Sequence, residues 1–387
     1  MSGTCSEISR RLRLGALFAI LLGMLLFPGA AHAGSGTVWY VNAGARPGGS
    51  GHSWAGAFTG LQDALARAHA GDQIWVAAGI YKPTADGDRS ATFLLVSGVA
   101  VYGGFPAGGS PGMPARERRK HATILSGEIG APGVADNSYH VVTGVTGATL
   151  DGFTVTSGNA DGSAPQDSGG GLYNTGASPA VSNCVFSGNT AKFGAGLDNL
   201  HGSSPTISGC VFSGNTATIV GGGLGDYDQS SPTIVDCVFW NNTAPTGAAI
   251  DDYKDCSPVL VACTFSGNTA DEGAAIYDYD GCFPTLTDCI LWGDTGDAEF
   301  HEDGGSMATV TYSLVQGGFA GTGNLSADPR FVNAATGNLH LLAGSPAIDT
   351  GTSTGAPAVD LDGVRRPQGA GFDMGAYEKR GTPGRDR

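Results

Sequence analysis

Apolar and polar positions repeat with a period of about 26 residues over residues 171–291. Each period has an aliphatic residue after a run of small residues, then a proline, then a cysteine close to a bulky apolar residue. The aliphatic positions are Leu172, Leu197, Leu224, Ile250 and Ile276, the prolines are Pro179, Pro205, Pro232, Pro258 and Pro284, and the cysteines are Cys184, Cys210, Cys237, Cys263 and Cys289. Such a repeat with glycine-rich turns is typical of stacked coils, so we expect a solenoid.

Each coil is predicted to contain three short strands. The first carries the aliphatic residue after the small residues, the second begins just past the proline, and the third directs cysteine and phenylalanine inward. A bend position between the second and third strands is filled mainly by residue types that tolerate the left-handed or turn conformation. The bend residues are Asn183, Gly209, Asp236, Ala262 and Asp288. Because one coil buries too little apolar surface to offset its own ordering, ladder hydrogen bonds to both neighbours must supply the rest.

The flanking segments predict caps. In residues 34–90 we expect a strand, a helix from Thr59 to Ala70 and a second strand, with Thr59 and Gln62 as a capping box. One helix at the start of a β chain is best explained as a plug over the first coil. The predicted organisation is an N-terminal cap (34–90), a solenoid (91–331) whose regular repeats run from about 169 to 294, a closing C-terminal cap (332–378) and a polar tail (379–387).

Residues 1–33 read as a secretory signal peptide. Arg10, Arg11 and Arg13 precede an apolar run, and Ala31 and Ala33 mark a cleavage site. The run is shorter than the roughly 20 residues that span a bilayer, and no second such run follows, so the mature chain is predicted to have no transmembrane span. We therefore expect a secreted protein, in the extracellular space, on the outer surface or in the periplasm.

The acidic net charge of the chain limits the classes of molecule that it can bind. The chain has 35 acidic and 20 basic residues and a formal net charge of −15. This excess excludes nucleic acid and anionic lipid, which require clustered Lys and Arg. Between His121 and Pro329 the only Lys or Arg residues are Lys192 and Lys254, so a polyanionic sugar would need a bridging cation there. The one basic cluster, Arg116 to Lys120, is predicted to be a solvated loop that pairs with nearby acids.

Three segments resemble known families. Phe-Ser-Gly-Asn blocks at 186–189, 212–215 and 265–268 resemble the repeats of polymorphic outer membrane proteins. Residues 360–378 resemble the C-terminal region of choice-of-anchor Q type secreted proteins, and residues 61–81 are similar to the opening of pectin lyase-like proteins. These resemblances imply an all-β fold, a right-handed parallel β-helix with a short N-terminal capping helix. The first implies adhesion, and the wider superfamily implies polysaccharide lyases and hydrolases.

An Asp-Tyr doublet follows the first strand of three coils and is the main candidate for ligand binding. The doublets are Asp226-Tyr227, Asp252-Tyr253 and Asp278-Tyr279. Aromatic faces beside carboxylates are typical of sugar sites, and a file of acids on a β-helix can hold calcium. Carboxylates on neighbouring coils would lie roughly 5 Å apart, a spacing that retaining glycosidases also use. A plain solvated turn ladder produced by duplication is the alternative.

Catalysis has few other candidates. Lysis by β-elimination needs a base and cations, and Lys254, close to Asp252 in sequence, is the single candidate base. His201 and His301 are isolated and are expected to be surface residues. Asp360 and Asp362 begin like a calcium loop but lack its remaining ligands. Arg365 or Arg366 is predicted to pair with Asp349 or Asp373 inside the cap.

The cysteines are predicted to be mostly structural. The five repeat cysteines would have Cβ atoms about 4.8 Å apart, outside the usual disulfide range near 3.8 Å, and zinc-ligand spacing is missing. We interpret them as buried hydrophobic residues. Cys256 and Cys282 lie in loops, so a disulfide clamp between adjacent coils is a hypothesis for that pair.

The sequence as a whole favours a non-catalytic adhesion or glycan-binding module for an extracellular polysaccharide or cell-surface glycan. A polysaccharide lyase or glycoside hydrolase is the alternative, followed by a purely structural passenger. Calcium is the one cofactor that the acidic file suggests.

Overall fold

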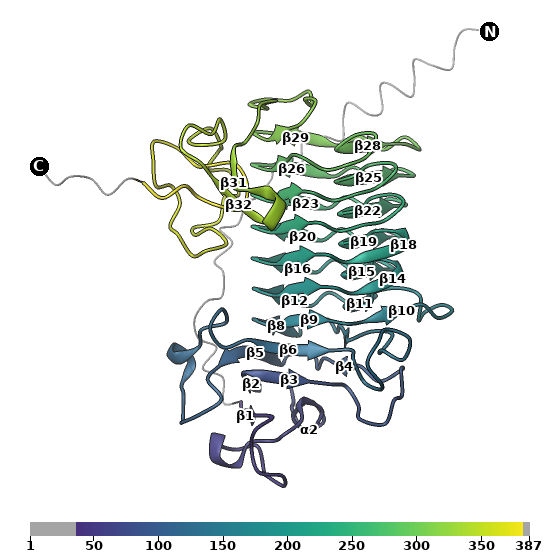
Figure 1. The fold of residues 1–387 in the computed structure, drawn as a ribbon, viewed down its shortest axis with the longest axis vertical. Helices are drawn as coiled ribbons and strands as arrows, with labels where there is room; N and C mark the ends of the chain where they lie inside the picture. The colour runs from purple at the N-terminus through teal and green to yellow at the C-terminus, as the bar shows by residue number, and fades with distance from the viewer. Residues whose placement is uncertain (1–35, 382–387) are drawn as a thin grey trace, which may run out of the picture. The chain divides into compact units, whose positions relative to one another are not determined.

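The computed structural model describes residues 36–381. The predicted signal peptide (1–33) lies outside these residues, as does the end of the polar tail. The described chain forms a stack of about nine parallel β coils, seen edge-on in Figure 1. No helix in residues 36–381 combines the length and apolar character needed to cross a membrane.

Three long sheets run the length of the stack, and every pairing within them is parallel. Sheet A contains β1 (Val38–Val41), β2 (Gln73–Ala77), β5 (Ala100–Phe105), β8 (Thr149–Asp151), β12 (Ala180–Ser182), β16 (Thr206–Ser208), β20 (Thr233–Val235), β23 (Val259–Val261), β26 (Thr285–Thr287) and β29 (Thr309–Thr311). Sheet B contains β3 (Gly79–Tyr81), β6 (Thr123–Ser126), β9 (Thr154–Thr156), β13 (Val185–Ser187), β17 (Val211–Ser213), β21 (Val238–Trp240), β24 (Thr264–Ser266), β27 (Ile290–Leu291) and β30 (Leu314–Val315). Sheet C contains β4 (Phe93–Leu94), β7 (Val142–Thr143), β11 (Leu172–Thr175), β15 (Leu197–Leu200), β19 (Leu224–Tyr227), β22 (Ile250–Tyr253), β25 (Ile276–Tyr279) and β28 (Phe300–Glu302).

A short fourth sheet, D, was not predicted. It contains β10 (Asn159–Ala160), β14 (Thr190–Phe193) and β18 (Thr216–Val220). Within one coil the chain passes through sheets B, D, C and A in that order, as β13, β14, β15 and β16 show. The three predicted strands of each coil are therefore present, and sheet D adds a fourth where the turn after sheet B is long enough to pair.

The core consists of identical side chains stacked from coil to coil. The rings of Phe186, Phe212, Phe239 and Phe265 are nearly parallel, with centroids 5.0, 4.7 and 4.8 Å apart along the stack. The five repeat cysteines are fully buried free thiols, as predicted. All five bend residues have φ between 52° and 60°, which confirms the predicted left-handed bends.

An asparagine ladder accounts for the last residue of each Phe-Ser-Gly-Asn block, and the sequence reasoning missed it. Asn189, Asn215, Asn242 and Asn268 are buried at the turn between sheets B and D. Each Nδ2 donates to the next rung's Oδ1 and to a backbone carbonyl, as Asn215 does to Asn242 at 3.0 Å and to Phe186 at 2.9 Å. The ladder keeps these buried amides fully hydrogen-bonded, which a single coil cannot do.

Residues 36–81 contain a strand, a helix and a second strand in the predicted order, although the helix is shorter than predicted. Helix α2 covers only Leu61–Leu65 and lies with β1 at one end of the stack (Figure 1). The predicted capping box is wrong, because Gly60 is the N-cap and no side chain caps it. Gln62 instead donates to the carbonyl oxygens of Pro83 and Thr92. Short 3₁₀ turns lie at η1 (Trp54–Gly56) and η2 (Met113–Ala115).

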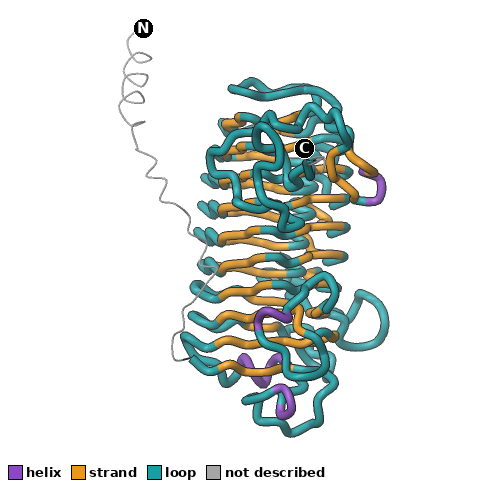
Figure 2. The backbone as a smooth tube through the Cα atoms, turned by 90° about the vertical axis from the view of Figure 1, so that its left-hand side faces the viewer, coloured by secondary structure: helices purple, strands orange, loops and turns teal. Residues whose placement is uncertain are grey.

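The C-terminal segment does not close the far end of the stack, which corrects the predicted closing cap. It contains the antiparallel pair β31 (Phe331–Asn333) and β32 (Asn338–Leu341) with η3 (Ala334–Thr336) between them. Figures 1 and 2 show it beside the coils. Leu339 and Ala376 pack on Val238, and the indole nitrogen of Trp240 donates to the carbonyl of Ala334 at 3.0 Å. Outward-facing residues of sheet B are thereby covered.

The buried pairing of Arg366 also differs from the prediction. Its guanidinium lies 3.1 Å from Asp236 of the solenoid and 3.5 Å from Glu378, and it donates to the backbone carbonyl of Asp373. Asp236 lies in the bend between β20 of sheet A and β21 of sheet B. The ion pair therefore attaches the C-terminal segment to a coil of the solenoid. The prediction failed because the partner is distant in sequence. The basic loop behaves as predicted, with Arg116 paired to Asp151 and Arg119 to Asp362.

The phenylalanine file yields the first prediction. Phe239 is fully buried between two stacked rings, so Phe239→Ala should lower the free energy of unfolding by about 3 to 5 kcal/mol in denaturant titrations. Phe283, which is 49% exposed, is the matched control, and Phe283→Ala should change stability by no more than about 0.5 kcal/mol. Equal losses in the free energy of unfolding for the two variants would show that the stacked phenylalanines do not stabilise the core.

Candidate functional site

The three aspartates of the predicted surface file lie inside the solenoid. Asp226, Asp252 and Asp278 are fully buried and stand in register on β19, β22 and β25. The reason is strand alternation: Leu224 faces the core, so Asp226, two residues later, faces it as well. A polysaccharide outside the coils does not reach these carboxyls. The surface position that their predicted ligand-binding and catalytic roles require is therefore corrected: all three side chains are inside the solenoid.

These aspartates continue a buried amide file. Asn174 donates to Asn199, and Asn199 donates to Oδ1 of Asp226, both at 2.8 Å. Burial raises the pKa of Asp226, Asp252 and Asp278 well above the usual 3.8. A neutral carboxyl has one proton to donate, so the file is consistent with a chain of protonated acids.

Calcium finds no support in this arrangement. Residues 36–381 contain no group of three or more His, Cys, Asp or Glu side chains arranged to hold a metal ion. The three aspartates lie one above another on successive strands. Calcium instead requires six to eight oxygen ligands arranged around a single ion.

Lys254 does not contact Asp252, which corrects the candidate base. Its Nζ lies 2.5 Å from Oδ1 of Asp228, and Nδ1 of His201 lies 2.8 Å from Oδ2 of the same aspartate. These ion pairs hold the pKa of Asp228 below its usual range and raise that of Lys254. Lys254 is exposed and protonated, and as such it cannot accept a proton from a substrate.

The predicted tyrosines divide into two groups. Tyr227 is buried, because its ring folds back over Gly225, where a Cβ would lie 2.5 Å from the tyrosine oxygen. Tyr253 and Tyr279 are 41% and 39% exposed, and their rings stack 5.6 Å apart at 10°. Two of the three predicted tyrosines are therefore accessible to a ligand.

The outward-facing file of sheet C was missed. It consists of the residues directly before the aspartates, which alternation turns to the outside. The file runs in register through Tyr173, Asp198, Gly225, Asp251, Tyr277 and His301. The sequence does carry a signal for this file. Side chains alternate along a strand, so the residue after each core-facing aliphatic residue must point outward.

The file is covered in the middle and open near β28. Asp198 and Asp251 are buried, and burial raises the pKa of Asp251 to about 8. Burial, with the nearby charges of Asp167 and Asp251, raises the pKa of Asp198 well above its usual value. Tyr277 stacks on His301 at 5.1 Å and lies 6.5 Å from Tyr279. We call Tyr253, Tyr277, Tyr279 and His301 the aromatic face.

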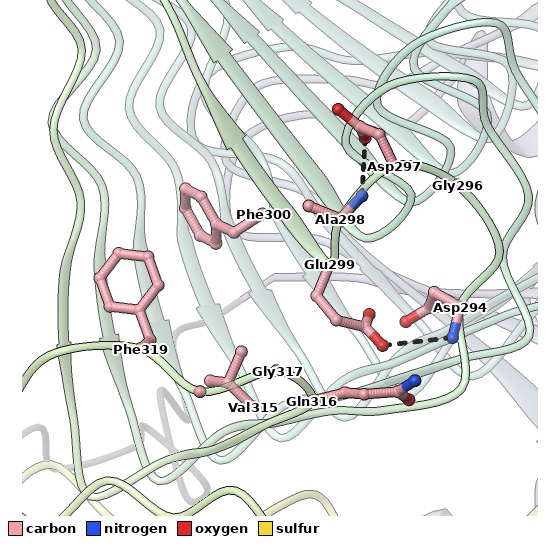
Figure 3. A pocket seen from close by; sticks show the side chains of 11 residues that line it. Asp294, Gly296, Asp297, Ala298, Glu299, Phe300, Val315, Gln316, Gly317 and Phe319 are labelled. Carbon is pink, nitrogen blue, oxygen red and sulfur yellow. Dashed lines mark hydrogen bonds between the residues drawn. The ribbon is translucent and has the colours of Figure 1, made fainter.

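A pocket of about 370 Å³ lies at the last coil, beside the loop that closes the stack (Figure 3). Phe300 and Phe319 line one side, with centroids 5.5 Å apart, and Asp294 and Glu299 line the other. Glu299 accepts hydrogen bonds from the backbone N–H groups of Gly293 and Asp294. Asp294 is the last rung of the asparagine ladder and accepts a hydrogen bond from Asn268. Glu299 accepts from the N–H of Asp294 and so replaces the missing next rung. Burial raises the pKa of both acids.

Cys256 and Cys282 are buried free thiols, so the hypothesised clamp is not formed in the structure. Each Sγ donates to a backbone carbonyl three residues earlier, Tyr253 and Tyr279 respectively, at 3.2 Å. The two thiols are thus held in the same orientation on neighbouring coils, an arrangement that keeps their Cβ atoms a full rung apart.

Comparison with known proteins supports the architecture. The family model described as right-handed β-helix region matches residues 139–321. The pectate lyase Pel9A superposes with a TM-score of 0.55 at 15% identity, covering 89% of this chain and 96% of that one. The fold is a right-handed parallel β-helix. At this identity the likeness shows the fold alone.

Two further structures are more distant. A pectin methylesterase mutant in complex with a hexasaccharide has a TM-score of 0.38 at 11% identity, covering 75% of this chain and 92% of that one. The pectin methylesterase from Aspergillus niger has a TM-score of 0.29 at 14% identity, covering 77% and 85%. No curated protein matches the chain. The resemblances to polymorphic outer membrane proteins and to choice-of-anchor Q proteins stay predictions.

The buried acids predict a stability that falls with pH. Asp251 has its pKa raised from 3.8 to about 8, so its contribution is fully present below pH 3.8 and is lost as the pH rises toward 8. Each such group lowers the free energy of unfolding by up to about 1.4 kcal/mol per pH unit in that window. Denaturant titrations at several pH values in this window should show a steady loss in the free energy of unfolding. Asp251→Asn should make the loss per pH unit smaller by the contribution of one titrating group. A stability that rises with pH would contradict the buried, protonated acids.

Proposed function

We propose that this protein is a secreted or cell-surface β-helix protein that binds an extracellular polysaccharide through the aromatic face without cleaving it. The observation that carries the proposal is the stack of exposed rings on sheet C: Tyr253 on Tyr279, with Tyr277 and His301 beside them. Rings fixed on successive coils, with centroids 5.6 Å apart for Tyr253 and Tyr279 and 5.1 Å apart for Tyr277 and His301, form a rigid strip along which a polymer can lie. Little side-chain entropy is lost on binding, because neighbouring rings already hold one another.

The contacts available on this strip suit a sugar. Stacked rings cover each other's faces, so they present edges and phenolic hydroxyls to a ligand, while the terminal rings of a stack also offer a face. Tyrosine hydroxyls and the imidazole donate to and accept from sugar hydroxyls. Asp297 lies 2.7 Å from His301 and adds a carboxylate to the same surface.

Charge favours a neutral glycan. The acidic groups whose charges act on Tyr277 include Glu272 and Asp303. Lys254, the nearest cation along the chain, is already paired with Asp228. A polyuronate would meet uncompensated negative charge here, whereas a neutral polysaccharide would not. In this respect the face differs from what a pectate ligand requires.

Adhesion to cell envelopes is the broader role that we propose, on the resemblance of the repeats to outer membrane proteins. The alternative, a polysaccharide lyase or glycoside hydrolase, is favoured by the shared fold with a pectate lyase and by the acid pair Asp294 and Glu299 in the pocket. It is disfavoured by the burial of Asp226, Asp252 and Asp278 and by the pairing of Lys254.

The test is retention on immobilised neutral and uronate polysaccharides. Tyr279→Ala removes an exposed ring and its hydroxyl, and it should weaken binding to the neutral ligand by about tenfold, equivalent to about 1.4 kcal/mol. Phe283→Ala, which removes a similarly exposed ring outside the aromatic face, is the control and should bind like the parent protein.

Two results would contradict the proposal. Equal binding by Tyr279→Ala and the parent protein would remove the aromatic face as the site. Release of reducing ends or of unsaturated uronides from any polysaccharide of the panel would assign the enzymatic alternative, and loss of that release in Glu299→Gln would place it in the pocket.

A further inference from the structure

The outward side of sheet A carries small uncharged side chains over six successive coils. Its first file faces solvent and consists of Ala180, Thr206, Thr233, Val259, Thr285 and Thr309. Its second file consists of Ser182, Ser208, Val235, Val261, Thr287 and Thr311. We call these two files the neutral face. The strands that carry it are the stacked arrows labelled β12, β16, β20, β23, β26 and β29 in Figure 1.

The regularity of this face is high. The register between each pair of neighbouring strands is continuous, without a bulge, from β12 to β29. Ile207, Ile234 and Leu260 face the core from the same strands, which fixes their neighbours on the outside. A third file of hydroxyls runs beside them, where Ser178 accepts from the N–H of Ser204 and Ser204 from that of Ser231. Equivalent groups therefore repeat at one rung, about 4.8 Å.

The lack of charge distinguishes this face in a protein with a formal net charge of −15. Neither file contains Asp, Glu, Lys, Arg or His, although exposed strands ordinarily carry charges that prevent edge and face association. A partner complementary to such a surface is itself uncharged. The files also contain no aromatic ring, which disfavours the stacking contacts by which proteins hold sugars.

The groups present are suited to holding water in a fixed pattern. Each threonine or serine hydroxyl donates one hydrogen bond and accepts two, and a bridging water is nearly as favourable as a direct contact. The methyl groups of threonine and valine between them restrict the orientation of adjacent water. A repeat of one rung is close to the repeat of oxygen atoms in the lattice of ice. Ordered water over the face can thus join a growing crystal.

We propose that the neutral face binds ice, with the free first file as the main contact. The second file is partly covered, since Val235 and Val261 are buried, and a Cβ placed at Gly355 of the C-terminal segment would lie 3.6 Å from Val261. The first file, by contrast, is exposed at Thr206, Val259, Thr285 and Thr309. This proposal concerns a different sheet from the aromatic face and does not rest on the glycan proposal.

The experiment measures how the full chain divides between slowly grown ice and the remaining liquid. The parent protein should be enriched in the ice and should slow its recrystallisation. Thr206→Lys combined with Thr285→Lys places two charged, bulky side chains in the first file and should return the protein to the liquid. Thr218→Lys, at an exposed strand threonine of sheet D, is the matched control and should behave like the parent. Thermal melts followed by circular dichroism confirm folding, and Thr285→Lys alone is used where the double variant unfolds.

Several results would overturn the proposal. Exclusion of the parent protein from ice would do so, as would enrichment that survives both substitutions. Dimerisation in sedimentation that the double variant abolishes would assign the face to a second copy of the chain. Retention on insoluble cellulose or chitin with the same dependence, and none on ice, would assign it to a crystalline polysaccharide.

Discussion

In-register stacking of like side chains is the interaction on which the rest of this structure depends. A coil of about 26 residues cannot offset its own conformational entropy, so it depends on contacts with the coils above and below. The phenylalanine rings meet face to face, the asparagine amides bond from rung to rung, and the cysteines fill the space between them. Because the sequence is duplicated, identical side chains lie over one another in successive coils. The core therefore contains only side chains that can pack against, or hydrogen-bond to, an identical side chain.

That constraint also explains the unusual acids. A carboxylate cannot lie directly over another carboxylate in a low dielectric, whereas a protonated carboxyl can donate to the next one. The buried aspartates of sheet C therefore become neutral, and the charge of the protein is carried elsewhere. The same ladder that buries Asp278 turns Tyr277 and Tyr279 outward, so one strand supplies both a core file and a ligand surface.

Much of this architecture could be predicted from the sequence because the repeat reveals it. The coil boundaries, the stacked phenylalanines, the buried cysteines and the left-handed bends at residues such as Asp236 follow from spacing and residue type alone. The orientation of the Asp-Tyr doublets also follows from the sequence, provided that they are placed at the end of a strand and not in the turn after it. Once Leu224 is placed inside, alternation decides the orientation of Asp226.

Other features had no local signal. The position of the C-terminal segment beside sheet B depends on Trp240 and on the ion pair of Arg366 with Asp236, contacts between residues about a hundred or more positions apart. In the pocket, Glu299 accepts the hydrogen bonds that an asparagine rung would otherwise take, although it comes from a different place in the coil. Long-range packing of this kind is decided by the three-dimensional fit of surfaces, and a repeat pattern does not encode it.

Thiol labelling along one strand tests the central claim most directly. The native cysteines of residues 36–381 are buried and should not react in the folded protein. Single substitutions Tyr277→Cys, Asp278→Cys and Tyr279→Cys should then react with a soluble thiol reagent in the order fast, protected and fast, with the protected site reacting only after denaturation. Equal reactivity at all three positions, or a reactive cysteine at 278, would contradict the stacked, alternating strand on which the account depends.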